Sequence, residues 1–127
     1  MTQEEKQLLL IDLCARLPYG VIAHALEINK LGTVTDINVS YNTINLTVDN
    51  ANGDYELVPI SDIKPYLRPL SSMTDEEENE YRTINCYEGL FPRNEDALDY
   101  VLFHHIDYRG LIPKGLALEA PEGMYKN

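Results

Sequence analysis

The chain has 127 residues and a formal net charge of -11, from 21 acidic and 10 basic side chains. This acidic balance excludes general electrostatic capture of nucleic acid or anionic lipid. No apolar run approaches the roughly 18 residues that span a bilayer, and the acidic start lacks the pattern of a secretory signal. We therefore expect a cytoplasmic protein without a membrane partner. The length predicts one domain, divided into an N-terminal helix and turn (1–20), a β unit (21–70) and a helical part (71–127).

Two cysteines, Cys14 and Cys86, are far apart in the sequence. In a reducing compartment we expect such thiols to be small buried groups rather than a disulfide. The chain contains no CxxC pair and no Cys/His cluster at the spacing of a zinc site. The sequence therefore indicates no metal or other cofactor.

The first element is predicted to be a helix. Thr2 and Glu5 form a capping box, in which each side chain accepts a backbone N–H of the first turn. Pro18 ends the helix because proline cannot continue its hydrogen-bond ladder. The apolar positions at helical spacing are Leu8, Leu9, Ile11, Cys14 and Ala15, which we expect to form the buried stripe.

From residue 21 to residue 60 the apolar period changes to two, which predicts short strands. They cover residues 21–28, 31–41, 44–48 and 55–60, and the connections are too short for anything but antiparallel pairing. We expect the turn-forming segment 49–54 to join the third and fourth strands. On the second strand, Thr35, Ile37, Val39 and Tyr41 are predicted to share one face.

The segment after the fourth strand is predicted to be a single helical turn, capped by Ser61 or Asp62 and containing Pro65. Four short strands closed by one tight turn indicate a small SH3-like barrel. The predicted fold class is therefore α+β: a small antiparallel β-barrel or curved sheet with one N-terminal helix and two C-terminal helices. Residues 116–118 are a candidate extra strand.

Two further helices are predicted in the C-terminal part. Thr74 and Glu77 form a second capping box, and that helix reaches about residue 84. Asn94 caps the last helix, and Gly110 is expected to end it in a left-handed conformation.

Three segments of the chain carry a resemblance: DLCARLPYGV (12–21), KPYLRPLSSM (64–73) and HHIDYRGLI (104–112), the last continuing to residues 123–125. Together they resemble a large set of small proteins encoded in phage, prophage and mobile regions of gut bacteria. The resemblance implies a small cytoplasmic accessory protein. It implies no reaction, ligand or catalytic residue.

The most chemically suggestive string is 104–109. A histidine beside a carboxylate, as in His104, His105 and Asp107, is typical of acid–base catalysis or metal binding. The structural alternative is that the two histidines lie in the last turn of a helix, where cationic groups meet free carbonyls. We expect Asp107 and Arg109 to form a local ion pair or a cap at the turn.

A base, a proline and a tyrosine recur in segments 16–20 and 64–69. This pattern is consistent with an aromatic and basic surface that grips a peptide or an acidic partner, or with two chain reversals fixed by Pro and Tyr. With segment 104–109, the candidate partner-binding residues are Arg16, Tyr19, Tyr66, Arg68, His104, His105, Asp107, Tyr108 and Arg109.

The acidic excess is consistent with solubility, with binding of basic protein surfaces, or with mimicry of DNA. Mimicry needs regularly spaced carboxylates on one face, whereas nine acids fall in residues 1–63 and twelve in 64–127. Our leading hypothesis is a non-enzymatic protein-interaction module. The alternatives are a small metal-dependent or acid–base enzyme centred on 104–109, and an acidic DNA mimic. No catalytic residue is assigned, and the oligomeric state is left open.

Overall fold

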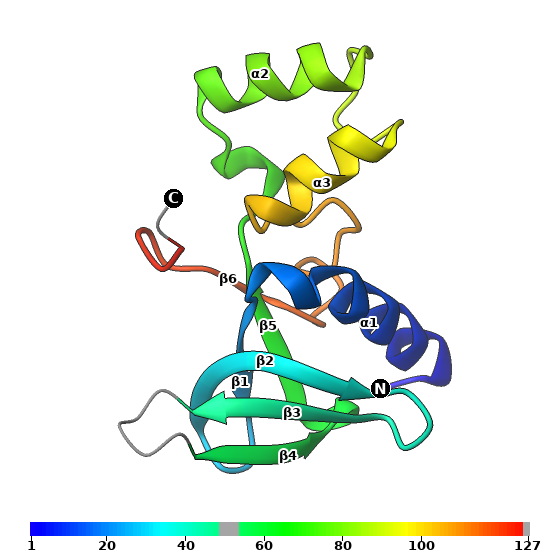
Figure 1. Cartoon of the computed structure of the whole chain (residues 1–127), viewed down its shortest axis with the longest axis vertical. Coiled ribbons are helices and arrows are strands. Elements are labelled where there is room, and N and C mark those ends of the chain that lie inside the picture. Colours follow the sequence, from blue (N-terminus) through cyan, green and yellow to red (C-terminus); the bar gives the residue numbers. More distant parts are fainter. Residues whose placement is uncertain (49–53, 126–127) are drawn as a thin grey trace.

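A six-stranded sheet and three α-helices form the part of the chain described by the computed structural model, residues 1–48 and 54–125 (Figure 1). The strands are β1 (Ile22–Ala25), β2 (Lys30–Asn38), β3 (Thr43–Val48), β4 (Tyr55–Pro59), β5 (Ile63–Leu67) and β6 (Leu118–Glu119). Their order is β4-β3-β2-β1-β5-β6. The α+β class is confirmed, but the SH3-like barrel is not, because the sheet is open between β4 and β6.

Helix α1 (Gln3–Arg16) begins at the predicted Thr2–Glu5 capping box, and a short 3-10 turn (Leu17–Tyr19) follows it. The predicted stripe is partly right: Leu9 is buried and Leu8 and Ala15 pack against the buried clusters. Ile11 and Cys14 are exposed, and Leu10 and Leu13 face the core in their place. The helix buries a polar pair, Asp12 and Arg16, on the same face. A pattern based only on apolar residues misplaces such a face.

Both cysteines, Cys14 and Cys86, are exposed and free, so the expectation of two buried thiols is wrong.

Strands β1 to β4 form the antiparallel meander that the period of two predicts. The predicted common face of Thr35, Ile37, Val39 and Tyr41 is wrong, because the pairing of β2 with β3 shifts register between Val34 and Asp36. This β-bulge reverses the alternation beyond it. Ile37 packs against the core as a result. The predicted turn at 49–54 lies largely outside the described residues.

The segment after β4 contains a strand where a helical turn is predicted. Only the 3-10 turn Ile60–Asp62 is helical, and Pro65 lies in β5, paired with Ala23 of β1. Buried Ile63, Pro65 and Leu67 alternate with more exposed residues along β5. Strand β6 overlaps the candidate strand at 116–118 and pairs with β5 in parallel, so the sheet is mixed rather than purely antiparallel.

Helices α2 (Asp75–Asn85) and α3 (Glu95–Phe103) have the predicted caps at Thr74 and Asn94. The predicted continuation of α3 to Gly110 is wrong. The helix ends at Phe103, and His105 adopts the left-handed conformation with φ 59°. The chain then turns back, and Ile106 forms a bridge with Arg68 beyond the end of β5.

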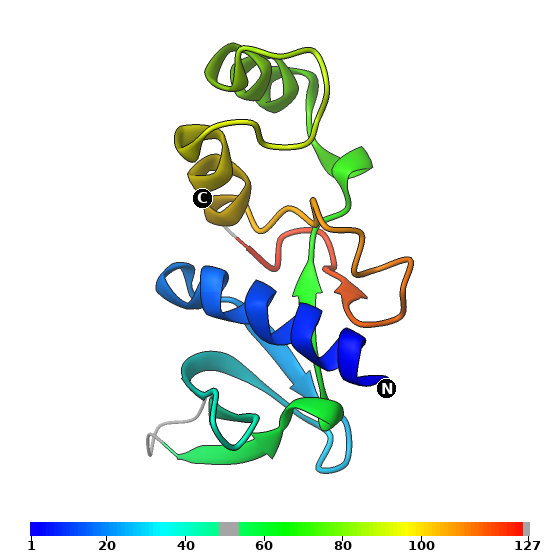
Figure 2. The same cartoon turned by 90° about the vertical axis from the view of Figure 1, so that its right-hand side faces the viewer.

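Two clusters of buried side chains hold these elements together. One lies between α1 and the sheet, and the other lies around α2, α3 and Ile106. Figure 2 shows α1 between the α2–α3 end of the molecule and the β2–β4 end.

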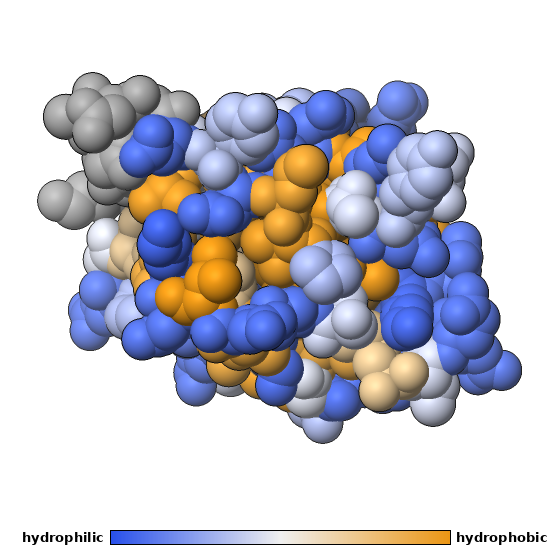
Figure 3. All heavy atoms as spheres, turned by 90° about the horizontal axis from the view of Figure 1, so that it is seen from below, coloured by the Kyte–Doolittle hydropathy of each residue, from blue (hydrophilic) through white to orange (hydrophobic). Residues whose placement is uncertain are grey.

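Apolar side chains are also exposed at the β2–β4 end, seen from below in Figure 3 among polar and charged neighbours. The sheet therefore presents apolar surface on the outside as well as the inside.

Candidate functional site

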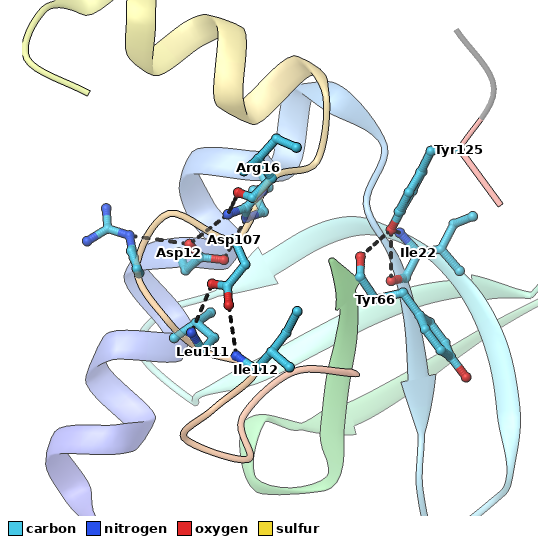
Figure 4. Close-up of polar contacts among 10 residues, drawn as sticks. Asp12, Arg16, Ile22, Tyr66, Asp107, Leu111, Ile112 and Tyr125 are labelled. Carbon is cyan, nitrogen blue, oxygen red and sulfur yellow. Dashed lines mark hydrogen bonds and ion pairs between the residues drawn. The ribbon is translucent and has the colours of Figure 1, made fainter. Parts of the chain in front are cut away.

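Arg16 is fully buried where the two clusters meet, and it makes internal contacts there. Its Nε donates to Asp12 Oδ2 at 2.7 Å, and its Nη2 donates to the Ile106 carbonyl at 2.8 Å (Figure 4). Arg109 Nε lies 3.3 Å from Asp12 Oδ1, so both arginines use the same carboxylate. The Tyr108 ring lies close to both guanidinium groups, 5.8 Å from Arg16 Cζ and 5.0 Å from Arg109 Cζ.

Asp107 caps the turn that follows it. Its two carboxylate oxygens accept the N–H groups of Leu111 and Ile112, at 2.8 and 2.9 Å. The predicted ion pair of Asp107 with Arg109 is therefore wrong, because Arg109 pairs with Asp12 instead. The cap, which was the other expected arrangement, is present.

Arg68 binds Glu77 with two hydrogen bonds, from Nη1 at 3.0 Å and from Nη2 at 2.8 Å. These bonds hold the pKa of Glu77 down at about 2. His104 Nδ1 lies 3.5 Å from the same carboxylate, and its ring packs 4.3 Å from that of Tyr100. Burial lowers the pKa of His104. The contacts among Arg68, Glu77 and His104 connect the end of β5 to α2 and to the end of α3.

His105 belongs to a different environment from His104. Its ring stacks on Tyr125, with 3.6 Å between the centroids, and burial lowers its pKa to about 4. The Tyr125 hydroxyl donates to the Tyr66 carbonyl at 2.6 Å and accepts the Ile22 N–H at 2.9 Å (Figure 4). The histidines that are adjacent in sequence therefore do not converge on one point. No group of three metal-ligating side chains occurs within residues 1–48 and 54–125.

Tyr19 and Tyr66 make different contacts. The Tyr19 hydroxyl donates to Asp99 Oδ1 of α3 at 3.3 Å, while Tyr66 belongs to β5. The structure thus brings Arg16, Tyr108 and Arg109 together, and Arg68 with His104, but it does not assemble all nine candidates into one surface.

A second region, which the sequence did not single out, is the outer sheet face, defined as the side of β2, β3 and β4 that faces away from α1. Cross-strand rows on this face join Thr33, Thr47 and Tyr55, and then Asp36, Asn45 and Leu57. Tyr55 and Leu57 are 62% and 68% exposed. Other exposed apolar side chains lie in the neighbouring turns and at the start of β2: Leu26, Ile28, Leu31, Val39 and Tyr41.

Strand β4 is also an open edge, because no described strand pairs with its other side. The Val48 N–H donates to the Asp54 carbonyl, and the Ile60 N–H donates to the Asn42 carbonyl. Hydrogen-bonding residues alternate along an antiparallel strand. Tyr55, Leu57 and Pro59 therefore turn their backbone groups away from β3, toward the open edge.

A hollow of ≈ 550 Å³ adjoins Leu57 on the outer sheet face, and we call it the β2–β4 hollow. It is lined by Asp36, Asn38, Tyr41, Thr43, Asn45 and Leu57. The bulge in β2 makes this lining, because it places both Thr35 and Asp36 opposite Asn45. Asn45 Oδ1 is buried and has no hydrogen-bond partner among the described residues.

The signal for this face was present in the sequence but was ambiguous. Tyr55 and Leu57 alternate with Glu56 and Val58, so both sides of the strand carry apolar residues. A strand of this kind is either buried on both sides or exposes a contact surface, and the sequence does not say which. In addition, the position of the bulge in β2 cannot be found from the period of the apolar pattern alone.

Comparisons with known proteins add no assignment: no family model, curated protein or solved structure matches the chain. None of the helices in the described part of the chain has the length and apolar character needed to span a bilayer.

Proposed function

We propose that the chain is a cytoplasmic, non-enzymatic protein-interaction module, of the small accessory kind found in phage and prophages, that binds an extended segment of another protein along β4. The observation that carries this proposal is the open β4 edge with two exposed side chains, Tyr55 and Leu57, on the adjoining face. An exposed edge strand is a template for pairing with a further strand.

Soluble proteins usually protect such an edge with charged residues, proline or a covering element. On β4 the proline comes only at the end of the strand, at Pro59, and the side chains beside the free backbone groups are Tyr55 and Leu57. The edge therefore offers two N–H donors, from Tyr55 and Leu57, and three carbonyl acceptors, from these residues and Pro59.

The energetics require both the edge and the face. Five backbone hydrogen bonds at about 1 kcal/mol each contribute roughly 5 kcal/mol, which is no more than the lower range of the association cost of 4–15 kcal/mol. Burial of Tyr55 and Leu57 adds about 2 kcal/mol for each side chain. The partner must therefore cover the outer sheet face as well as pair with the backbone.

The candidate residues of segment 104–109 lie outside this proposed site. His104, His105, Asp107 and Arg109 are each engaged in contacts that hold loops and helices in place. We therefore assign these residues to the fold rather than to an acid–base or metal-dependent reaction.

The experiment is a selection of peptides from a random library on the wild-type chain, followed by binding measurements on Leu57→Pro. Proline at this position removes an N–H that faces away from β3, so the native ladder keeps its hydrogen bonds. We expect the selected peptides to bind Leu57→Pro at least tenfold more weakly. Circular dichroism of the variant checks that the fold is retained.

Amide hydrogen exchange provides the second measurement. The Tyr55 and Leu57 amides should exchange rapidly in the free protein, where they face away from β3, and slowly in the complex, where the partner strand accepts their hydrogens. A library that yields no peptide sensitive to Leu57→Pro, together with unchanged exchange at these two amides, would overturn the proposed function.

A further inference from the structure

A second hollow lies at the α2–α3 end of the molecule, where the loop before α3 meets the segment after it. It has a volume of ≈ 370 Å³, and its lining includes Phe91, Arg93, Glu95, Leu98, Tyr108 and Arg109. We propose that this Arg93–Arg109 hollow binds a small aromatic acid, in which a carboxylate or phosphate group is carried on an apolar ring. The lining contains no residue of β4, so a small-molecule site is added to the protein contact proposed there.

Three buried hydrogen-bond donors near this hollow lack an acceptor. Arg16 Nη1, Tyr108 Oη and Arg109 Nε have no hydrogen-bond partner among the described residues. Arg109 Nε is 3.3 Å from Asp12 Oδ1, which is close enough for an ion pair but is not aligned for a hydrogen bond. The centroid of the Tyr108 ring lies 5.8 Å from Arg16 Cζ and 5.0 Å from Arg109 Cζ, so the donors form one group. Buried polar groups almost always have a partner, and such a group of free donors therefore indicates an acceptor from another molecule.

The charge of this group favours an anion as the acceptor. Arg16 and Arg109 share the single carboxylate of Asp12, so one positive charge is left over. Asp107, the carboxylate of the returning segment, uses both oxygens to accept backbone N–H groups of its own turn. Arg16 is 0% exposed and does not touch a ligand, but its charge is only weakly screened in the dry interior.

The ligand would contact the two arginines that line the hollow, Arg93 and Arg109. The Arg109 side chain is 28% exposed, and its described polar neighbours, Asp12 and the Tyr108 hydroxyl, leave most of its five N–H donors free. Arg93 is exposed and forms no ion pair with a described residue, and its Cζ lies 4.6 Å from the centroid of the Tyr87 ring. Two guanidinium groups that line one hollow can bind the oxygens of a single carboxylate or phosphate.

The lining also has an apolar part that suits a ring. Phe91 is 60% exposed, and its ring meets that of Tyr108 edge-on, with 5.9 Å between the centroids. A planar ring in the hollow can pack against Phe91 and cover Leu98 of α3. Glu95 also lines the hollow, but its side chain is exposed to water, where its repulsion of an anion is screened. The volume is at the low end for small-molecule sites, which favours a compact ligand.

The test is an NMR titration of the full chain with four small probes. Benzoate and phenyl phosphate carry the anion on a ring, benzamide keeps the ring without the charge, and acetate keeps the charge without the ring. We expect the tighter of the two ring anions to bind with a Kd of about 1 mM, and benzamide and acetate to bind about tenfold more weakly. Shifts of the Leu98 and Arg109 backbone amides locate the bound probe. Whichever ring anion binds more tightly assigns the hollow to carboxylates or to phosphate esters.

Two variants and a matched control attribute the binding to the arginines. Arg93→Gln removes an exposed guanidinium group, so the fold should be kept while the ring anion binds about fivefold more weakly. Arg109→Met should weaken the ring anion about tenfold. Neither variant should change the affinity for benzamide, which would also fall if the hollow were lost through misfolding. Arg82→Gln, at a 45% exposed side chain of α2 outside the lining, changes the net charge equally and should keep the wild-type affinity.

Three results would overturn the inference. If neither ring anion shifts an amide of the hollow at about 20 mM, the free donors serve no such ligand. If both ring anions bind no more tightly than benzamide, the arginines do not select for charge. If Arg93→Gln and Arg82→Gln weaken binding equally, only the net charge of the chain matters. None of these results bears on peptide binding at β4, which the Leu57→Pro comparison tests separately.

Discussion

The junction around Arg16 and the outer sheet face at β4 contrast in how their side chains are exposed. At the junction, Asp12 and Arg16 are charged and 0% exposed. On the outer sheet face, the apolar residues Tyr55 and Leu57 are 62% and 68% exposed. Charged groups are buried only where an ion pair or hydrogen bond compensates them. Covering exposed apolar groups with another molecule is favourable because it removes them from water. The contrast teaches that reactive residue types alone do not show which part of a chain stays exposed.

The junction shows how polar groups can serve the fold. Asp12 receives Arg16 from its own helix and Arg109 from the chain after α3, and Arg16 also donates to the Ile106 carbonyl. The Asp12–Arg16 bond lies within α1, whereas the contacts with Arg109 and with the Ile106 carbonyl join α1 to the segment that returns from the α2–α3 end. The group therefore fixes the position of α1 between the two buried clusters.

The largest expected effect is at Arg16. Replacing Arg16 with Met leaves Asp12 with only Arg109 and leaves the Ile106 carbonyl unpaired, and we expect a loss of about 3–5 kcal/mol in the free energy of unfolding. Urea titration measures this loss. Arg109→Met, at a side chain that is 28% exposed, should lose about 1 kcal/mol. Similar small losses in both variants would show that the buried Arg16 pair contributes no more to the free energy of unfolding than a partly exposed ion pair does.

The second effect concerns His105, whose pKa is lowered by burial to about 4. An unfolded histidine has its usual pKa near 6.5, so the unfolded chain binds a proton before the folded chain does. His105 therefore contributes full stability above about pH 6.5, and this contribution is lost as the pH falls from 6.5 toward 4. Across that whole interval the loss approaches about 3 kcal/mol.

His105→Asn removes this titration, and asparagine accepts the left-handed conformation at this position, where φ is 59°. The pH dependence of the unfolding free energy should become shallower between about pH 6.5 and about pH 4.5. His24→Asn, at a half-buried ring hydrogen bonded to Asn29, is the matched control for the replacement of one histidine by asparagine. Parallel profiles for His105→Asn and the wild type would place the His105 ring in water, contrary to its stacking on Tyr125.

Local signals gave much of the fold. The capping boxes at Thr2 and Thr74 and the cap at Asn94 depend on a few adjacent residues, and the structure confirms all three. The bulge at Thr35 and the strand around Pro65 depend on pairing partners far along the chain. Those partners cannot be identified from the period of the apolar pattern.

The candidate site was harder to predict for the same reason. His104 and His105 are adjacent in sequence, yet one meets Glu77 and the other meets Tyr125. Conversely, Asp36, Asn45 and Leu57 belong to three strands and become neighbours only through the register of the sheet. Their residue types are ordinary for turns and strands, so the sequence carried no signal for the hollow.

The smallest expected effect is at the β4 edge, and it tests the other half of the contrast. Leu57→Thr and Tyr55→Thr remove exposed apolar side chains, so each should change the free energy of unfolding by less than about 0.5 kcal/mol. Val58→Thr, one residue along and 3% exposed, buries a hydroxyl and should cost about 2 kcal/mol. Thermal and urea unfolding of the three variants compare neighbouring positions on opposite faces of one strand. Equal losses at Leu57 and Val58 would mean that Leu57 packs within the fold, and the outer sheet face would then have no apolar surface to offer a partner.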